Sequence, residues 1–170
     1  MMNMKKQSGA ALVVVLILLL VITILGLASM RGALLQERMA GAAYARSVAF
    51  NAAETALRVA EAHAKTKPAL PASGCDAGVC AQPGPAAAPV WEANGFWGAN
   101  ASTASVSLGA EYQGVEAKYI IQDMGKSNTC VEVDLTASIC PPAEQVYRIV
   151  ARAVTANGTE VVLQSTYRIQ

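Results

Sequence analysis

The stretch AALVVVLILLLVITILGLASM, residues 10–30, decides how this chain is built. It contains no charged residue, and its only side-chain hydroxyls are those of Thr23 and Ser29. As a helix rising about 1.5 Å per residue, it would span roughly 30 Å, the thickness of the hydrocarbon core of a bilayer. No second stretch of this kind follows. The sequence therefore predicts one transmembrane anchor, residues 10–30, that carries a water-soluble remainder.

The short tail MMNMKKQSG, residues 1–9, bears on the orientation of this anchor. Its two lysines favour a cytoplasmic N-terminus, which would place the rest of the chain on the opposite side of the membrane. Arg31, Arg38 and Arg46 on the other side of the anchor reduce this charge asymmetry. We therefore expect a single-pass membrane protein whose C-terminal domain lies outside the cytoplasm.

Length and composition limit what the remainder can be. The 170 residues leave about 140 outside the anchor, enough for one small domain. The net charge is +1 and no run of one sign occurs, so we expect no nucleic-acid partner. Hydrophobic residues make up 54% of the chain and aromatic residues only 5%, which indicates that the apolar excess lies in helices.

Residues 31–67, RGALLQERMAGAAYARSVAFNAAETALRVAEAHAKTK, contain no proline. Because alanine, leucine, glutamate and arginine are strong helix formers, we expect one helix that continues from the anchor and ends before Pro68. Apolar residues recur at helical spacing in its second half, which predicts an amphipathic helix that packs on a partner. The predicted stripe consists of Phe50, Ala53, Leu57, Ala60 and Ala64.

Residues 68–109 are dense in proline, glycine, alanine and serine, and they carry no periodic pattern. We expect an irregular loop region here, with Trp91 and Trp97 covering the edge of the core rather than contacting a partner. In residues 110–170 the pattern changes to strands, which predicts an antiparallel sheet that ends in a hairpin. The fold class is therefore α+β, a long helix packed on a small C-terminal antiparallel sheet.

Asn157-Gly158 marks the turn of that hairpin, because a type I′ turn needs positive φ at both central residues. A two-residue loop would pair Val154 with Val161. In this register neither face of the hairpin is cleanly apolar, so the face that lies on the helix stays open.

The chain contains four cysteines, at positions 75, 80, 130 and 140. In an oxidising compartment we expect disulfides, and four cysteines allow three connectivities. Short loops close most readily, which favours Cys75 with Cys80 and Cys130 with Cys140. Their spacing differs from that of paired CxxC zinc sites, so we expect no metal.

Nothing in the sequence indicates catalysis. His63 is the single histidine, and we expect it to be a solvated helix residue. No specific Ser, His, Asp constellation and no glycine-rich phosphate loop occurs, so we expect neither an enzyme nor a bound cofactor.

The tail that ends in Gly9, followed at once by the apolar stretch, resembles the class III signal of type IV prepilins. The resemblance implies that a prepilin peptidase cuts between Gly9 and Ala10 and methylates the new terminus. In most pilins the fifth residue of the mature chain is a glutamate that pairs with the terminus of a neighbouring subunit. That position is Val14 here, a departure from the pattern. An ordinary secretory signal, cut near Gly26-Leu27-Ala28, is the alternative.

The segment QERMAG, residues 36–41, and the downstream AF and AAETALR, residues 49–50 and 52–58, resemble the N-terminal signature of the PilX family of minor type IV pilins. The resemblance implies a pilin-like fold and a priming role at or near the pilus tip. The partners would be other minor pilins, the major pilin and the inner-membrane assembly platform. A minor pseudopilin of a type II secretion system and a membrane-anchored periplasmic binding module are the alternatives.

By the same resemblance, Cys130 and Cys140 would form the outward-facing disulfide loop that pilins often carry near the C-terminus. Before assembly the protein would be anchored in the bacterial inner membrane with its C-terminal domain in the periplasm, and after assembly it would lie in the pilus at the cell surface.

The first prediction concerns processing. We expect the mature chain to begin at Ala10 with a methylated amine, and mass spectrometry of the N-terminal peptide measures this. A terminus near Ser29 would instead indicate an ordinary secretory signal and a soluble product.

Overall fold

The computed structural model describes residues 10–98, 102–112, 114–127, 131–134, 137–139 and 142–170. Gly9, Cys130 and Cys140 lie outside the described residues. The chain forms two compact units, Met1–Tyr44 and Ala45–Gln170, which are treated separately.

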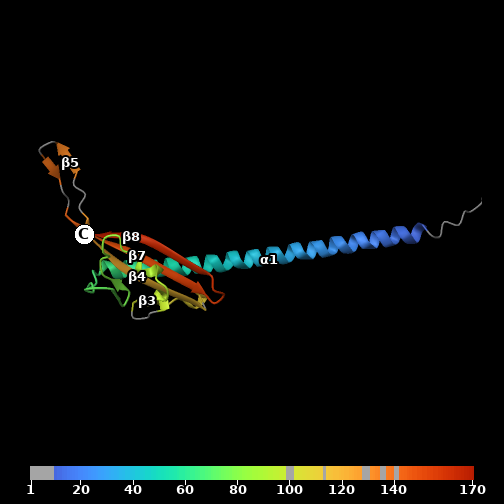
Figure 1. Cartoon of the computed structure of the whole chain (residues 1–170), viewed down its shortest axis with the longest axis horizontal. Helices are drawn as coiled ribbons and strands as arrows, with labels where there is room; N and C mark the ends of the chain where they lie inside the picture. Colours follow the sequence, from blue (N-terminus) through green and yellow to red (C-terminus); the bar gives the residue numbers. More distant parts are fainter. Residues whose placement is uncertain (1–9, 99–101, 113, 128–130, 135–136, 140–141) are drawn as a thin grey trace, which may run out of the picture. The chain divides into compact units, whose positions relative to one another are not determined.

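One helix, α1 (Ala10–Lys65), supplies the whole described part of the first unit and enters the second (Figure 1). The hydrogen bonds of the last turn and the proline that follows explain where this helix ends. The amides of Thr66 and Lys67 donate to the carbonyls of His63 and Ala64, both at 3.0 Å, and Lys67 has a φ of 50°. This turn satisfies the last helical carbonyls, and Pro68 cannot continue the helix.

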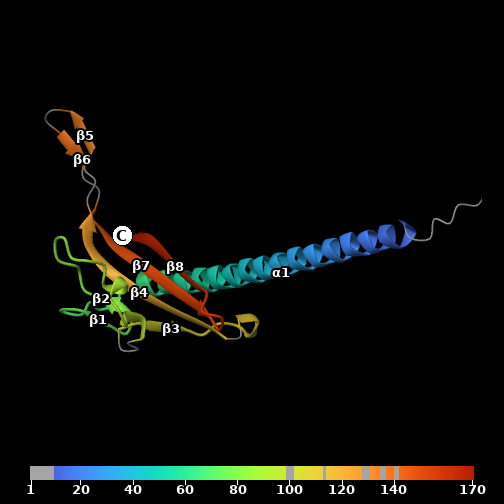
Figure 2. The ribbon, with the colours of Figure 1, turned by 45° about the vertical axis from the view of Figure 1, so that its right-hand side comes forward.

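The second unit contains a six-stranded sheet and a separate two-stranded sheet (Figures 1 and 2). The main order is β1 (Cys75–Asp76), β2 (Val79–Cys80), β4 (Val115–Ser127), β7 (Glu144–Thr155) and β8 (Glu160–Ile169), and β3 (Ala104–Val106) also pairs with β4. The small sheet is β5 (Val131–Asp134) with β6 (Ala137–Ile139). Three short 3₁₀ helices lie between strands: η1 (Val90–Glu92), η2 (Phe96–Gly98) and η3 (Ala110–Tyr112).

The strands of residues 110–170 pair antiparallel, as expected, but a short strand from residues 68–109 makes the main sheet mixed. β2 pairs with β4 in parallel, with Val79 opposite Ile121, while the other pairings are antiparallel. β1, β2 and β3 all lie within residues 68–109, the region expected to be irregular. Strands of two or three residues are too short to show an alternating pattern, which explains why they were not predicted.

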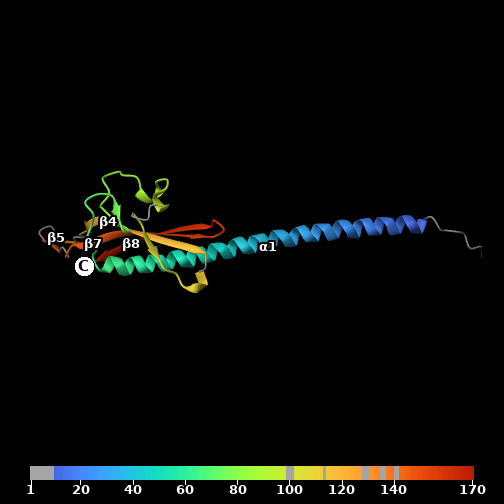
Figure 3. The same cartoon turned by 90° about the horizontal axis from the view of Figure 1, so that it is seen from below.

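The C-terminal part of α1 lies on one face of the sheet (Figure 3). Its fully buried residues are all alanines, namely Ala49, Ala52, Ala53, Ala56, Ala60 and Ala64. They pack on bulky side chains of the sheet, among them Tyr119, Ile121, Tyr147 and Ile149. The expected stripe was thus wrong at Phe50, which is 47% exposed, because the sheet supplies the bulk and the helix contributes small residues.

The β7–β8 hairpin forms with a register one residue away from the prediction. Val154 pairs with Glu160 rather than with Val161. The loop has three residues, and Gly158 has positive φ whereas Asn157 does not. The amide of Thr155 donates to the carbonyl of Thr159 at 3.0 Å, and the Thr155 hydroxyl accepts the amide of Thr159 at 3.1 Å. A three-residue loop with glycine at its left-handed position explains the shift.

The corrected register settles which face of the hairpin meets the helix. A shift of one residue moves every side chain of β8 to the other face. In β8 the residues that pack on the core are Val161, Leu163, Tyr167 and Ile169. Together with Tyr147, Ile149, Ala151 and Ala153 of β7 they form the helix-facing side of the sheet.

The type I′ geometry occurs instead between β1 and β2. Ala77 and Gly78, the two turn residues, have φ values of 46° and 83°. A disulfide joins Cys75 to Cys80, which are paired across the same two strands. The Gly78 carbonyl also accepts the amide of Ile121 at 2.7 Å, which holds the turn against β4.

The second prediction tests this turn. A Cβ at Gly78 would lie 2.6 Å from the Cβ of Ala104 and 2.9 Å from its amide nitrogen. Gly78→Ala should lower the free energy of unfolding by roughly 1–3 kcal/mol from the left-handed backbone alone, before the clash is counted. The matched control is Ala77→Gly, which relieves a strained alanine and should change stability by under about 1 kcal/mol. Urea denaturation of the detergent-solubilised chain measures both, and equal losses would contradict this assignment of the turn.

Candidate functional site: assembly surfaces

The first candidate surface is the apolar half of α1. Every described residue of the first unit, residues 10–44, is exposed within the chain. An 18-residue window of α1 reaches a mean hydropathy of 3.3, and the helix is long enough to cross a membrane. An apolar surface of this size must be covered by something other than water. Lipid and the apolar helices of other subunits are the two kinds of neighbour that fit it.

The polar groups of this surface lie mostly in its second part. Residues 10–30 contain the hydroxyls of Thr23 and Ser29, whereas residues 31–44 include charged side chains such as Arg31 and Arg38. The Thr23 hydroxyl donates to the Leu20 carbonyl at 2.8 Å, so the helix itself satisfies this group. Ala10 is the first residue of α1, and Val14 lies one turn further along with 56% of its surface exposed. A Cβ added at Gly26, Gly32 or Gly41 would meet no atom within 4 Å. These glycines therefore leave open space on the helix surface where another helix can approach closely.

The second candidate surface is the outer face of the main sheet, meaning the face opposite α1. Trp91, Phe96 and Trp97, from the 3₁₀ helices η1 and η2, pack there against the core residues Ile120 and Val150. The Trp97 indole N–H donates to the Trp91 carbonyl at 3.0 Å, and Phe96 meets Trp97 edge to face with centroids 5.6 Å apart. Both tryptophans thus cover core residues, as the sequence indicated.

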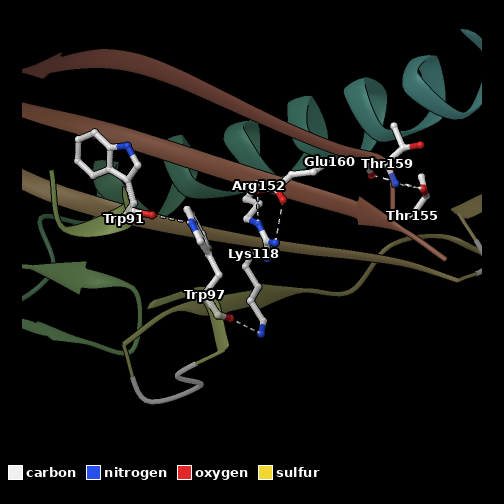
Figure 4. Close-up of polar contacts among 7 residues, drawn as sticks. All are labelled: Trp91, Trp97, Lys118, Arg152, Thr155, Thr159 and Glu160. Atoms are coloured by element: carbon white, nitrogen blue, oxygen red, sulfur yellow. Dashed lines mark hydrogen bonds and ion pairs between the residues drawn. The ribbon is translucent and has the colours of Figure 1, made fainter. Parts of the chain in front are cut away.

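A cation of β7 lies at each of the two indole rings, and Figure 4 shows Arg152 beside Trp97. The Arg148 guanidinium is 5.5 Å from the Trp91 centroid, and that of Arg152 is 5.7 Å from the Trp97 centroid. At such distances a guanidinium is attracted to the face of the ring. The ammonium of Lys118, on β4, donates to the Trp97 carbonyl at 2.9 Å. Trp97 is therefore held by one cation through its ring and by another through its backbone.

Lys118 and Arg152 are directly opposite each other on β4 and β7, an arrangement of like charges that costs free energy. Each has a carboxylate that offsets this cost. Glu116 lies 2.6 Å from the Lys118 ammonium, and Glu160 receives two hydrogen bonds from Arg152, at 2.7 and 3.1 Å. The hydrogen bond from Arg152 lowers the pKa of Glu160, because it stabilises the charged form of this carboxylate.

A shallow pocket of about 470 Å³ opens between the tryptophan segment and β8. Trp91 and Trp97 form its apolar side, and Glu92, Glu160 and Val162 also line it. Val162 is 45% exposed although it belongs to a strand. The pocket thus combines aromatic rings, an exposed aliphatic group and two carboxylates.

His63 is not the solvated residue expected from the sequence. Its Nδ1 lies 3.1 Å from the Tyr119 hydroxyl, and the two rings meet edge to face at 6.2 Å. Burial raises the pKa of Tyr119 further above its usual range. The pair links the helix to the sheet. Among the described residues, no three His, Cys, Asp or Glu side chains are grouped so as to hold a metal ion.

The sequence placed Ala10 and Val14 on the apolar helix, and the structure has them there. It also favoured Cys75 with Cys80, and the structure contains that disulfide. The cations of the outer face were not anticipated. Arg148 and Arg152 are four residues apart on one strand and so share a face, which is a signal that sequence alone carries. Their pairing with Trp91 and Trp97 depends on contacts between distant segments and has no such signal.

A long apolar N-terminal helix that continues into a helix packed on a small mixed sheet defines a pilin-like α+β protein. Comparison with family models agrees. The model described as PilX N-terminal matches residues 8–58, and that described as type IV pilus assembly protein PilX C-term matches residues 49–169. The chain therefore belongs to the PilX family of type IV pilus assembly proteins. Searches of curated proteins and of solved structures gave no significant match.

The third prediction concerns the attachment of the tryptophan segment. Trp97→Ala should lower the free energy of unfolding by roughly 1–3 kcal/mol, because it removes the indole hydrogen bond and the contact with Arg152. Trp97→Phe keeps an aromatic face and should lose only the hydrogen bond, about 0.5–1.5 kcal/mol. Urea denaturation of the full chain in detergent distinguishes them. Equal losses in the two variants would show that the contact with Arg152 contributes nothing.

Proposed function

We propose that the protein is a minor pilin that primes assembly in the inner membrane and then lies at or near the tip of the pilus. Val14 is the observation that carries the proposal, because it is an exposed valine at the position where most pilins have a glutamate. Membership of the PilX family supports the choice of a pilus over a secretion pseudopilus.

The physical reasoning concerns a buried charge. After cleavage before Ala10, each subunit brings an amine into the apolar bundle of helices, where an unpaired charge is costly. Ordinary subunits supply a carboxylate at their own fifth residue to neutralise the amine of a neighbour. A subunit at the tip has no neighbour above it, so its carboxylate would be buried without a partner. A valine avoids that cost.

Orientation, processing and partners follow from the same proposal. The N-terminus lies in the cytoplasm and the second unit in the periplasm, and prepilin peptidase cuts between Gly9 and Ala10. The apolar half of α1 then moves from lipid into a bundle with other minor pilins and the major pilin, at the inner-membrane assembly platform.

We also propose a disulfide between Cys130 and Cys140. β5 and β6 support it, because Val131 pairs with Ile139, and these residues directly follow Cys130 and precede Cys140 in the sequence. Such a bond would close the loop that contains the small sheet, on the outward side of the subunit.

The fourth prediction tests the role of Val14 directly. Val14→Glu restores the missing carboxylate, so the variant should be accepted below other subunits. Its abundance in sheared pili should rise severalfold, or piliation should fall because priming fails. Quantitative mass spectrometry of sheared pili, with Val14→Leu as the apolar control, measures the change.

Unchanged abundance and unchanged piliation in Val14→Glu would show that another part of the chain determines where the subunit lies. Deletion of the whole chain provides the reference for priming. If deletion leaves piliation intact, the priming role itself is wrong.

A further inference from the structure

β8 is an edge strand of unusual regularity. Among the described strands it pairs with β7 alone, and it lies at the margin of the sheet (Figure 2). All ten of its residues, Glu160–Ile169, are paired with β7 without a shift in register. An edge of this length presents a row of backbone groups that another strand can use.

The turn identifies which backbone groups point outward. The bond from the Thr155 amide to the Thr159 carbonyl makes these two residues a hydrogen-bonded pair. Hydrogen-bonded and non-hydrogen-bonded pairs alternate along an antiparallel ladder. Odd-numbered residues of β8 therefore bond to β7, and even-numbered residues direct their N–H and C=O groups away from it. The outward row consists of Glu160, Val162, Gln164, Thr166 and Arg168.

β8 carries few of the features that usually block an edge. Natural edge strands are protected by charged side chains, especially lysine, by proline, by a bulge or by a short length. β8 contains no lysine and no proline, its ladder with β7 has no bulge, and its two charged residues, Glu160 and Arg168, lie near its two ends. Its exposure alternates along the whole strand, with Val161, Leu163, Tyr167 and Ile169 half-buried over the core. Each of these side chains leaves apolar surface that a further strand would cover.

The pocket between the tryptophans and β8 lies on the outer face along the same edge, since Glu160 and Val162 line it. A strand added to β8 would place a side chain of this face next to Val162. The pocket offers that side chain two indole rings and the carboxylate of Glu92, whereas the carboxylate of Glu160 is already bonded to Arg152. A lysine or arginine matches it, because its stem packs on the rings and its charge complements Glu92.

We propose that the β8 edge is a docking site for an extended segment of another pilus subunit, which adds to the main sheet as a further strand. The segment would carry apolar residues at every second position and a basic residue in the pocket. The inference rests on the proposed role in pilus assembly. Backbone hydrogen bonds would provide affinity, and the pocket would provide specificity.

A second copy of this chain is the less suitable occupant. β8 runs alongside residues 45–65 of α1 (Figures 1 and 3). Two β8 strands related by a two-fold axis across an antiparallel pair would set the Ala45 ends of their helices at opposite ends of the dimer. Two chains anchored in one membrane through their N-terminal segments do not fit that arrangement.

The fifth prediction uses proline as a probe of one amide. Gln164→Pro removes an outward N–H and adds a ring at the edge, yet leaves every bond between β7 and β8 in place. Gln164→Thr keeps the amide and is the matched control. Both are made in the full chain with a photo-cross-linking residue at Thr166, in cells that assemble pili. Cross-linked products are identified by peptide mass spectrometry.

We expect the Thr variant to cross-link to a defined strand segment of another pilus subunit. In the Pro variant the yield should fall at least about tenfold, equivalent to about 1.4 kcal/mol. No cross-link to a pilus subunit in the Thr variant, a cross-link between two copies of this chain, or equal yields in the two variants would overturn the proposal.

Folding is checked separately by thermal melting of the full chain in detergent. Ser165→Pro removes an amide that β7 uses and should lower the melting temperature strongly, whereas Gln164→Pro should lower it little. Equal losses would mean that the Gln164 amide already donates a hydrogen bond within the chain, which contradicts the proposal that the β8 edge is open to another strand. The proposed minor-pilin role fails instead if deletion of the chain leaves piliation intact, so the two failures are distinguishable.

Discussion

The second unit depends on the close approach of an alanine stripe to a sheet. Six alanines of α1 are completely buried, whereas the bulk between helix and sheet comes from tyrosine and isoleucine side chains of β4 and β7. Small residues allow the helix backbone to lie near the strands, and a larger side chain at any of these positions would push the two layers apart. Because the helix covers one face of the sheet so closely, the sheet presents polar, charged or aromatic groups to other molecules only at its outer face and its edges.

The sequence was sufficient where a periodic pattern extends over many residues. The length of α1, its end before Pro68 and the strand character of residues 110–170 could all be predicted, because helical and strand periods are visible in such stretches. The sheet's first three strands could not, since they are two or three residues long. The hairpin was located correctly, but its predicted register was wrong by one residue. Asn157-Gly158 marked the turn correctly, but a third loop residue shifted the register and exchanged the faces of β8.

Some residues of the candidate surfaces could be found from the sequence in the same way, and others could not. Ala10 and Val14 could be singled out from sequence because the resemblance to prepilins counts positions from Gly9. The arrangement of Trp91 and Trp97 over Arg148 and Arg152 depends on residues some fifty positions apart, which local patterns do not connect. His63 differed from its expected role for a related reason. Its partner, Tyr119, reaches it only because the sheet packs on the last turns of α1.

The internally satisfied hydroxyl of Thr23 has a consequence for the neighbours that this part of the helix can accept. Around Thr23 the surface presents apolar groups and no hydroxyl that needs an outside partner, so a lipid chain and a leucine of a neighbouring helix are chemically alike to it. Exchanging one for the other would change the free energy of this segment little. For a subunit that moves from a membrane into a pilus, the driving force would then come from other parts of the chain or from work done by the assembly machinery.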